Sequence, residues 1–355
     1  MRKTRFFRTA KQLFAIASTT ARESMQEPVA FLIYVCAVLI TVLVPVFQFN
    51  RFSEAGRLAR DSGLSTMLVF GLILAAGVSG RAVAGEIESG TAAAIIGKPV
   101  SRITFLLAKA LGVFWVITIF WFGVLCATLS AERISARFVT LPDFAGYVTD
   151  YLTLAFAILG VGLVMAVGAA THFFRRRSFG LLVFNGIALA QLCVTLISGF
   201  YSRLGRPFYV FGEAGCGCGN PQHHAHLQRV IYSAELNLRI IPAAILVLLA
   251  LAVFVALAAA LATRLRSGAT LIVCALVLML GLTGDTFAFS ADLFSWKILP
   301  SGLLPDLQHF WLSDALADGG RIAMRYVIRA ALYACTCCAL FLTIGCVAFQ
   351  NRDLG

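Results

Sequence analysis

A group of charged side chains lies in a polar stretch, residues 80–102, between two apolar runs. It carries two carboxylates, Glu86 and Glu88, and ends in a Lys-Pro-Val-Ser-Arg turn. Proline cannot continue a helix and restricts the residue before it, so Pro99 predicts the end of the short run that precedes it. Ser101 is then placed to cap a following helix. A chain that leaves a membrane, turns and re-enters it has this pattern, so the residues alone indicate a charged loop between two spans.

Nucleotide binding is not predicted in this stretch. A phosphate-binding loop follows Gly-x-x-x-x-Gly-Lys-Ser/Thr. Here Gly97-Lys98 is followed by Pro99, Gly90 lies too far upstream, and no other stretch fits. The chain is therefore expected to hydrolyse no ATP itself and to need no cofactor.

The segment Gly77-Val78-Ser79-Gly80 matches the Gly-x-Ser-Gly pattern of serine intramembrane proteases. Such a serine needs a histidine at the same depth to take its proton. His172 falls at a helix end, and the other four histidines lie in long polar segments. Close packing by small residues explains the pattern better. An intramembrane enzyme is the least favoured function.

A second group of reactive residues lies between 201 and 239. Thiolate and imidazole suit Cu(I) or Zn(II), but the cysteines of structural zinc sites are usually separated by two to four residues. A solvated loop is the favoured interpretation, and a disulfide with a neighbouring chain is a third one. The weak metal candidates are Cys216, Cys218, His223, His224 and His226.

Polar residues inside apolar runs are costly and therefore informative. Gln191, Thr195 and Ser198 fall on one face of the run 179–200, with Asn185 a little off it. They line either a substrate path or a hydrogen-bonded seam between helices, and the seam is favoured.

The elements that position these residues are membrane helices. The chain has 355 residues, of which 60% are hydrophobic and 13% charged, and its mean hydropathy is +0.88. Soluble domains carry about 25% charged residues, so the bilayer must be the solvent. Because a span needs about 20 apolar residues, we predict an all-α, polytopic bundle in a single membrane domain, 28–355. Its eight spans are 28–48, 64–84, 105–129, 151–172, 179–200, 240–262, 269–289 and 326–349.

The charge distribution predicts the orientation of these spans. With the N-terminus in the cytoplasm, inner segments hold 16 Lys or Arg against 5 acids, and outer segments hold 12 against 11. Basic residues favour cytoplasmic loops. The net charge of +12 is therefore a topology signal, with both termini cytoplasmic, and does not indicate nucleic-acid binding.

Two segments outside the spans have a predicted place at the membrane. Residues 1–27 repeat apolar side chains at helical spacing with basic residues off that stripe, which predicts an amphipathic helix in the cytoplasmic interface. Residues 290–325 contain Phe310 and Trp311, which predict a short interfacial helix under the outer leaflet.

The polar stretch and the end of the chain resemble ABC-2 type transporter permeases. Members carry an acidic pair, a Gly-Thr, a short coupling helix, a Lys-Pro-Val-Ser-Arg-like turn and a Lys-Leu-Gly-like entry to the next span. The resemblance is specific over about 80–112 and 299–355. Many members have six spans, so eight is a departure. The matching residues that it implies for docking an ATPase are Glu86, Glu88, Gly90, Thr91, Lys98, Pro99, Arg102 and Lys109.

The resemblance implies a membrane-spanning permease subunit, most simply of an exporter in the cell membrane. Its implied partners are a separate ATP-hydrolysing subunit, which binds the loop 85–102, and a second permease subunit. The first alternative is a secondary transporter that needs no ATPase. That alternative predicts charged or broken helices at mid-membrane depth, of which the sequence offers almost none.

Overall fold

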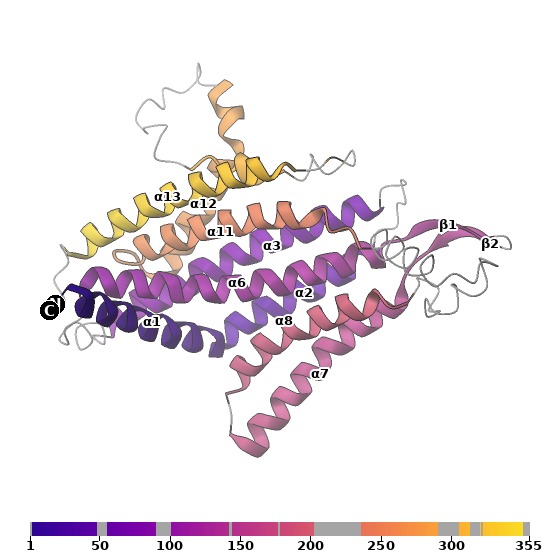
Figure 1. Ribbon diagram of the computed structural model, residues 1–355, viewed down its shortest axis with the longest axis horizontal. Coiled ribbons are helices and arrows are strands. Elements are labelled where there is room, and N and C mark those ends of the chain that lie inside the picture. The colour runs from indigo at the N-terminus through magenta and orange to yellow at the C-terminus, as the bar shows by residue number, and fades with distance from the viewer. Residues whose placement is uncertain are drawn as a thin grey trace.

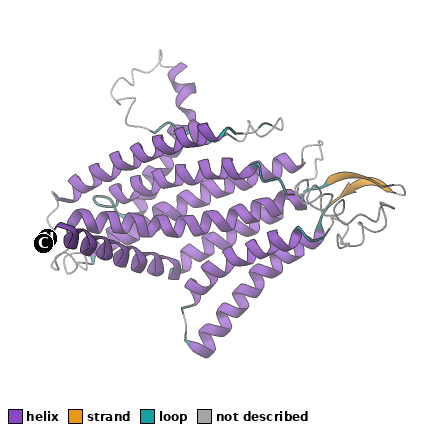
Figure 2. Cartoon of the chain, in the orientation of Figure 1, coloured by secondary structure: helices purple, strands orange, loops and turns teal. Residues whose placement is uncertain are grey.

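The computed structural model describes residues 2–47, 55–89, 101–141, 144–176, 178–201, 236–289, 305–312, 320 and 322–350. These residues form one bundle of long helices, in which α1 begins and α13 ends at the same end (Figure 1). A two-stranded hairpin stands at the opposite end (Figure 2).

Eight apolar helices occupy the places that the sequence predicts, which confirms the polytopic helical bundle. Seven are long and apolar enough to cross a membrane, and the apolar part of α12 whose side chains are described, Ser267–Leu282, is shorter. The helices are α2 (Pro28–Phe47), α3 (Ala55–Ser79), α6 (Arg102–Ile134), α7 (Tyr151–Arg175), α8 (Phe179–Ser198), α11 (Ile240–Leu261), α12 (Ser267–Phe289) and α13 (Met324–Gln350).

Two helices are longer than the bilayer requires. Helix α3 continues through a π-helical turn, Gly80–Gly85, into α4 (Glu86–Glu88), so that 33 residues, Gly56–Glu88, form one rod. Helix α6 also has 33 residues. At 1.5 Å per residue each is about 50 Å long, against a hydrocarbon core of about 30 Å. Both rods are therefore long enough to extend beyond the hydrocarbon core.

The N-terminal helix α1 (Arg2–Gln26) connects two spans at the end where α6 begins. Ala17 and Thr20 pack against Gly112 of α6, and the carbonyl of Met25 contacts Gly180 at the start of α8. Ala17, Ala21 and Met25 are buried. The helix therefore packs against the N-terminal parts of α6 and α8, and its place at a lipid surface stays a prediction.

Two features were not predicted. Strands β1 (Arg137–Leu141) and β2 (Phe144–Val148) pair antiparallel between α6 and α7. Within the segment 290–325, the described residues 305–312 do not form the interfacial helix that we expected, and residues 290–304, 313–319 and 321 lie outside the described residues. Residues 305–312 hold only a 3-10 turn, Gln308–Phe310, and Leu307 and Phe310 are buried against α11. Their apolar side chains fill a crevice between helices. This packing, which the aromatic residues alone did not indicate, replaces the position at the membrane surface that we expected.

The arrangement yields a labelling prediction. Helices α7 and α11 both run back toward the end of the bundle where α1 begins, which we expect to be cytoplasmic. Residue 176, in the turn between α7 and α8, and residue 265, in the turn between α11 and α12, are therefore expected to be cytoplasmic. Cysteine labelling in sealed cells checks this. A membrane-impermeant reagent that reacts from outside at either position contradicts the topology.

Candidate coupling site

The end of the α3 rod is shaped by its π-helical turn. A π turn takes in one more residue than an α turn and is frequent at functional sites. A Cβ on Gly80 would lie 2.7 Å from the Cα of Ser267, so only glycine lets this turn pass the first residue of α12. The turn thereby brings Glu86 to face α6.

Glu86 forms an ion pair inside the chain. Its carboxylate accepts a hydrogen bond from Nζ of Lys109 in α6, and only 4% of the lysine side chain and 22% of the glutamate side chain are exposed. The ammonium also lies 5.7 Å from the centre of the Phe105 ring. Glu86 therefore fastens the end of the α3 rod to α6.

Glu88 is placed differently. Its carboxylate lies 3.6 Å from Nε of Arg266 before α12, and 54% of its side chain is exposed. Exposed pairs contribute little, about 0–1 kcal/mol. Of the two glutamates, Glu88 is the one that a partner protein can reach.

A third ion pair joins the turn to the junction between α1 and α2. Nη2 of Arg81 lies 2.5 Å from a carboxylate oxygen of Glu27. Burial raises the pKa of Glu27, and the charge of Arg81 opposes that rise. The π-helical turn and α4 together thus contact the α1–α2 junction, α6 and the residue before α12 through charged groups.

The start of α6 is bound to the end of α13. Ser101 caps α6 as predicted, because its Oγ accepts the backbone N–H of Thr104 at 3.1 Å. Nη1 of Arg102 donates to the carbonyls of Phe349 and Gln350 at 3.2 and 2.9 Å. A guanidinium at a helix C-terminus satisfies carbonyls that have no helical partner.

The predicted site residues are therefore partly assembled. The structure brings Glu86, Glu88, Arg102 and Lys109 to one end of the bundle. Gly90, Thr91, Lys98 and Pro99 lie outside the described residues. Lys109 was expected among the docking residues, and its pairing with Glu86 inside the chain was missed, because the two lie 23 positions apart in the sequence.

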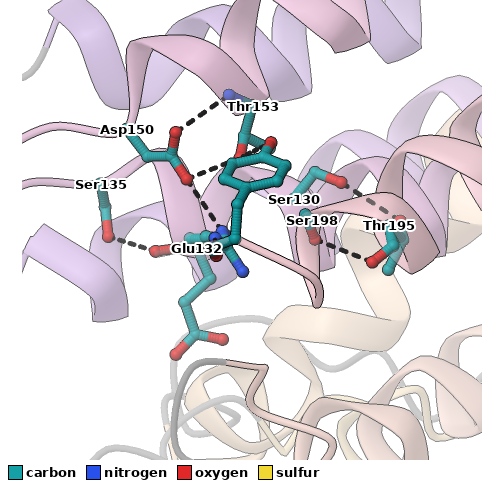
Figure 3. A network of polar contacts seen from close by, with 9 residues as sticks. Ser130, Glu132, Ser135, Asp150, Thr153, Thr195 and Ser198 are labelled. Atoms are coloured by element: carbon teal, nitrogen blue, oxygen red, sulfur yellow. Dashed lines mark hydrogen bonds and ion pairs between the residues drawn. The ribbon is translucent and has the colours of Figure 1, made fainter. Parts of the chain in front are cut away.

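The polar residues of α8 bond to neighbouring helices. Nε2 of Gln191 donates to the carbonyl of Ala157 in α7 at 3.3 Å. Oγ1 of Thr195 donates to the carbonyl of Cys126 in α6 at 3.0 Å and lies 3.2 Å from Oγ of Ser130. Ser198 bonds to Thr195, as Figure 3 shows. These contacts fit the hydrogen-bonded seam. Asn185 is exposed, and its Nδ2 donates to the carbonyl of Leu181 in its own helix at 2.8 Å and to Sδ of Met25 in α1 at 3.5 Å.

A buried ion pair closes the opposite end of the bundle. Nε of Arg133 in α6 donates to Asp150 at 2.8 Å, and neither side chain is exposed. Asp150 caps α7 by accepting the backbone N–H of Thr153 at 2.9 Å (Figure 3). Nη2 of Arg133 donates to the carbonyl of Tyr201, whose ring lies under the guanidinium. Sequence reasoning missed this network, although Asp is a preferred residue immediately before a helix, the place that Asp150 has before α7.

The five weak metal candidates, Cys216 to His226, lie outside the described residues. Among the residues that the structure does describe, no group of three or more His, Cys, Asp or Glu side chains could hold a metal ion.

The fold and this end of the bundle define a multi-pass membrane protein with a braced polar stretch between two long spans. A family model described as ABC-2 family transporter protein matches residues 7–201. The chain therefore belongs to the ABC-2 family and is a membrane permease of an ABC transporter. A comparison with curated proteins found no match.

Proposed function

We propose that this permease exports its cargo with energy from ATP hydrolysed in a separate subunit, and that residues 85–102 are the docking site for that subunit. Permeases of the ABC-2 family work with an ABC ATPase, which supports the kind of partner. The observation that carries the proposal is the braced end of the α3 rod, where Glu86 is joined to Lys109 and Glu88 projects beyond it.

The bracing suggests how force passes from the ATPase to the spans. A loop held only by its ends would yield when pushed. Here the loop begins on a helix that is continuous through the membrane and ends on α6, which is itself bonded to α13 through Arg102. Movement of the loop therefore shifts α3 and α6 together. Their rearrangement is the alternating-access step of the proposed cycle.

The proposed assembly holds two permease subunits and two ATPase subunits in the cell membrane, with both permease termini in the cytoplasm. Each permease chain is a single membrane domain, 28–355, with α1 on the cytoplasmic surface. The excess of basic residues in the inner segments supports this orientation. Cytoplasmic ATPases can reach residues 85–102 only in this orientation.

Purification of the chain from its native membrane tests the proposal. We expect an ATPase subunit with a phosphate-binding loop to co-purify, and ATP hydrolysis by the complex to rise with cargo. Transport that continues without any ATPase and stops when the proton gradient is dissipated contradicts the proposal and favours the secondary transporter.

A further inference from the structure

Helices α7 and α13 are equally uncovered in the single chain but differ in chemistry. In each helix, only 22% of an apolar 18-residue stretch is buried inside the chain. The uncovered face of α7 is apolar over its whole length in the membrane, including Leu159 and Leu163. The uncovered face of α13 carries Arg325 and Arg329, and neither guanidinium pairs with an acid of any residue that the structure describes. The two faces therefore suit different surroundings.

The packing of α13 against α11 fixes the depth of this face. A Cβ on Gly345 would lie 2.8 Å from the Cα of Ala260, and Nη2 of Arg264 donates to the carbonyl of Ala348 at 2.8 Å. Each residue of α13 therefore lies at the same depth as the residue of α11 whose number is smaller by 84 or 85. Tyr333 lies beside the middle of α11, whose 22 apolar residues span the membrane.

The segment 305–312 lies at the same depth. Leu307 and Phe310 are 2% exposed and line a cavity of only about 10 Å³ with Val247 and Phe254 of α11. The phenol of Tyr333 accepts the backbone N–H of Asp306 at 2.9 Å, and the phenol of Tyr326 donates to the carbonyl of His309 at 2.8 Å. The segment is therefore held on the side of α13.

This segment presents an ionisable pair to the outside of the single chain. Nδ1 of His309 lies 2.9 Å from a carboxylate oxygen of Asp306, and 57% and 48% of the two side chains are exposed. Ionisable groups at this depth are costly in contact with lipid and almost always face protein or water. Arg325, Arg329 and Leu332 with Asp306 and His309 form a face that is here named the α13 face. By the same register the two arginines lie level with the first residues of α11, so Asp306 and His309 are the groups that make this face unsuited to lipid.

We propose that a second copy of this chain covers the α13 face, while the exposed face of α7 meets lipid. The face carries both guanidiniums and a carboxylate, so it can pair with itself around a two-fold axis, where each contact occurs twice. This inference rests on the proposed two-subunit permease and names the surface through which the subunits meet. The polar pair then lies at the subunit boundary.

Photo-crosslinking from two matched positions tests this proposal. Leu332 on the α13 face and Leu159 on α7 are 65% and 66% exposed. A benzophenone amino acid is placed at either position in the full chain, and two differently tagged copies are expressed together in native membranes. We expect a crosslinked species that carries both tags from position 332 and none from position 159, which attaches to lipid alone.

A charge variant gives a second readout of the same contact. Arg329→Glu sets like charges against Asp306 and is expected to lower the yield of the doubly tagged species about tenfold or more, whereas Arg175→Glu at the end of α7 leaves it unchanged. Crosslinks to lipid or to another protein from position 332, or a doubly tagged species from position 159, overturn the proposal. The crosslink needs no ATPase, so a chain that co-purifies with its ATPase and fails this test keeps the proposed function and loses only this interface.

Discussion

Alanine at both Glu86 and Glu88 is expected to abolish transport while the chain remains inserted in the membrane. Loss of a desolvated charge at a protein interface costs about 2–5 kcal/mol, enough to weaken docking tenfold or far more. Glu86→Ala also leaves Lys109 without its carboxylate, and its side chain is only 4% exposed. Breaking a buried pair costs about 3–5 kcal/mol. The double variant therefore removes both the bracing and the proposed contact.

The single variants separate these two effects. Glu88→Ala removes only an exposed pair with Arg266, worth at most about 1 kcal/mol. It is expected to leave thermal stability unchanged and to reduce both ATPase binding and transport. Glu86→Ala is expected to lower the stability as well. Transport in vesicles and thermal unfolding in detergent measure the two effects.

Three controls make the interpretation specific. Arg266→Ala removes the internal partner of Glu88 and is expected to be mild, as is Arg57→Glu at the opposite end, where Arg57 pairs with Asp61 at 3.8 Å. Arg102→Glu is expected to be as damaging as the double variant, because it also releases α6 from the carbonyls of α13. Normal transport by the double alanine variant with its ATPase still bound would show that the loop is only a turn between spans.

Asp150→Ala is expected to lower the free energy of unfolding by about 3–5 kcal/mol, because it leaves the fully buried guanidinium of Arg133 without its counter-charge. The cap of α7 is lost as well, which typically costs about 1 kcal/mol. The measurement is unfolding of the purified chain in lipid micelles. A loss below about 1 kcal/mol contradicts the structural role.

A paired replacement serves as the control for Asp150. When both members of a buried pair are replaced by apolar residues of similar volume, stability is often kept or raised. Arg133→Met with Asp150→Leu is therefore expected to recover much of the loss, whereas Thr153→Val removes only the contacts of the Thr153 hydroxyl with Asp150 and Tyr201. A paired replacement as unstable as Asp150→Ala would mean that the cap and the bonds to Tyr201 matter more than the charge balance.

The sequence could predict the spans because each apolar run has about the 20 residues that the hydrocarbon core requires and is bounded by charge. It could predict the cap at Ser101 because capping is local. It could not pair Glu86 with Lys109, because that contact depends on how the π-helical turn rotates the end of α3. The types of the site residues therefore sufficed to identify them. The types did not indicate that Glu86 would pair inside the chain and that Glu88 would be exposed.

The segment 305–312 shows a different limit. Its aromatic residues match an interfacial helix as well as a segment packed between spans, and composition cannot choose between the two. The choice depends on the crevice between α11 and α12, which Leu307 and Phe310 occupy. The depth of Asp306 and His309 follows from that packing, so no pattern along the chain indicates it.

The account depends most on the claim that residues 85–102 bind an ATPase. A benzophenone amino acid at Thr91, inside this stretch, tests it directly in native membranes, with the same probe at Arg57 as the control for the opposite end. We expect the Thr91 probe to capture a subunit that mass spectrometry identifies by its phosphate-binding loop, and the Arg57 probe to capture none. Capture of that subunit from position 57, or its absence from position 91 in a complex that hydrolyses ATP, would contradict the account.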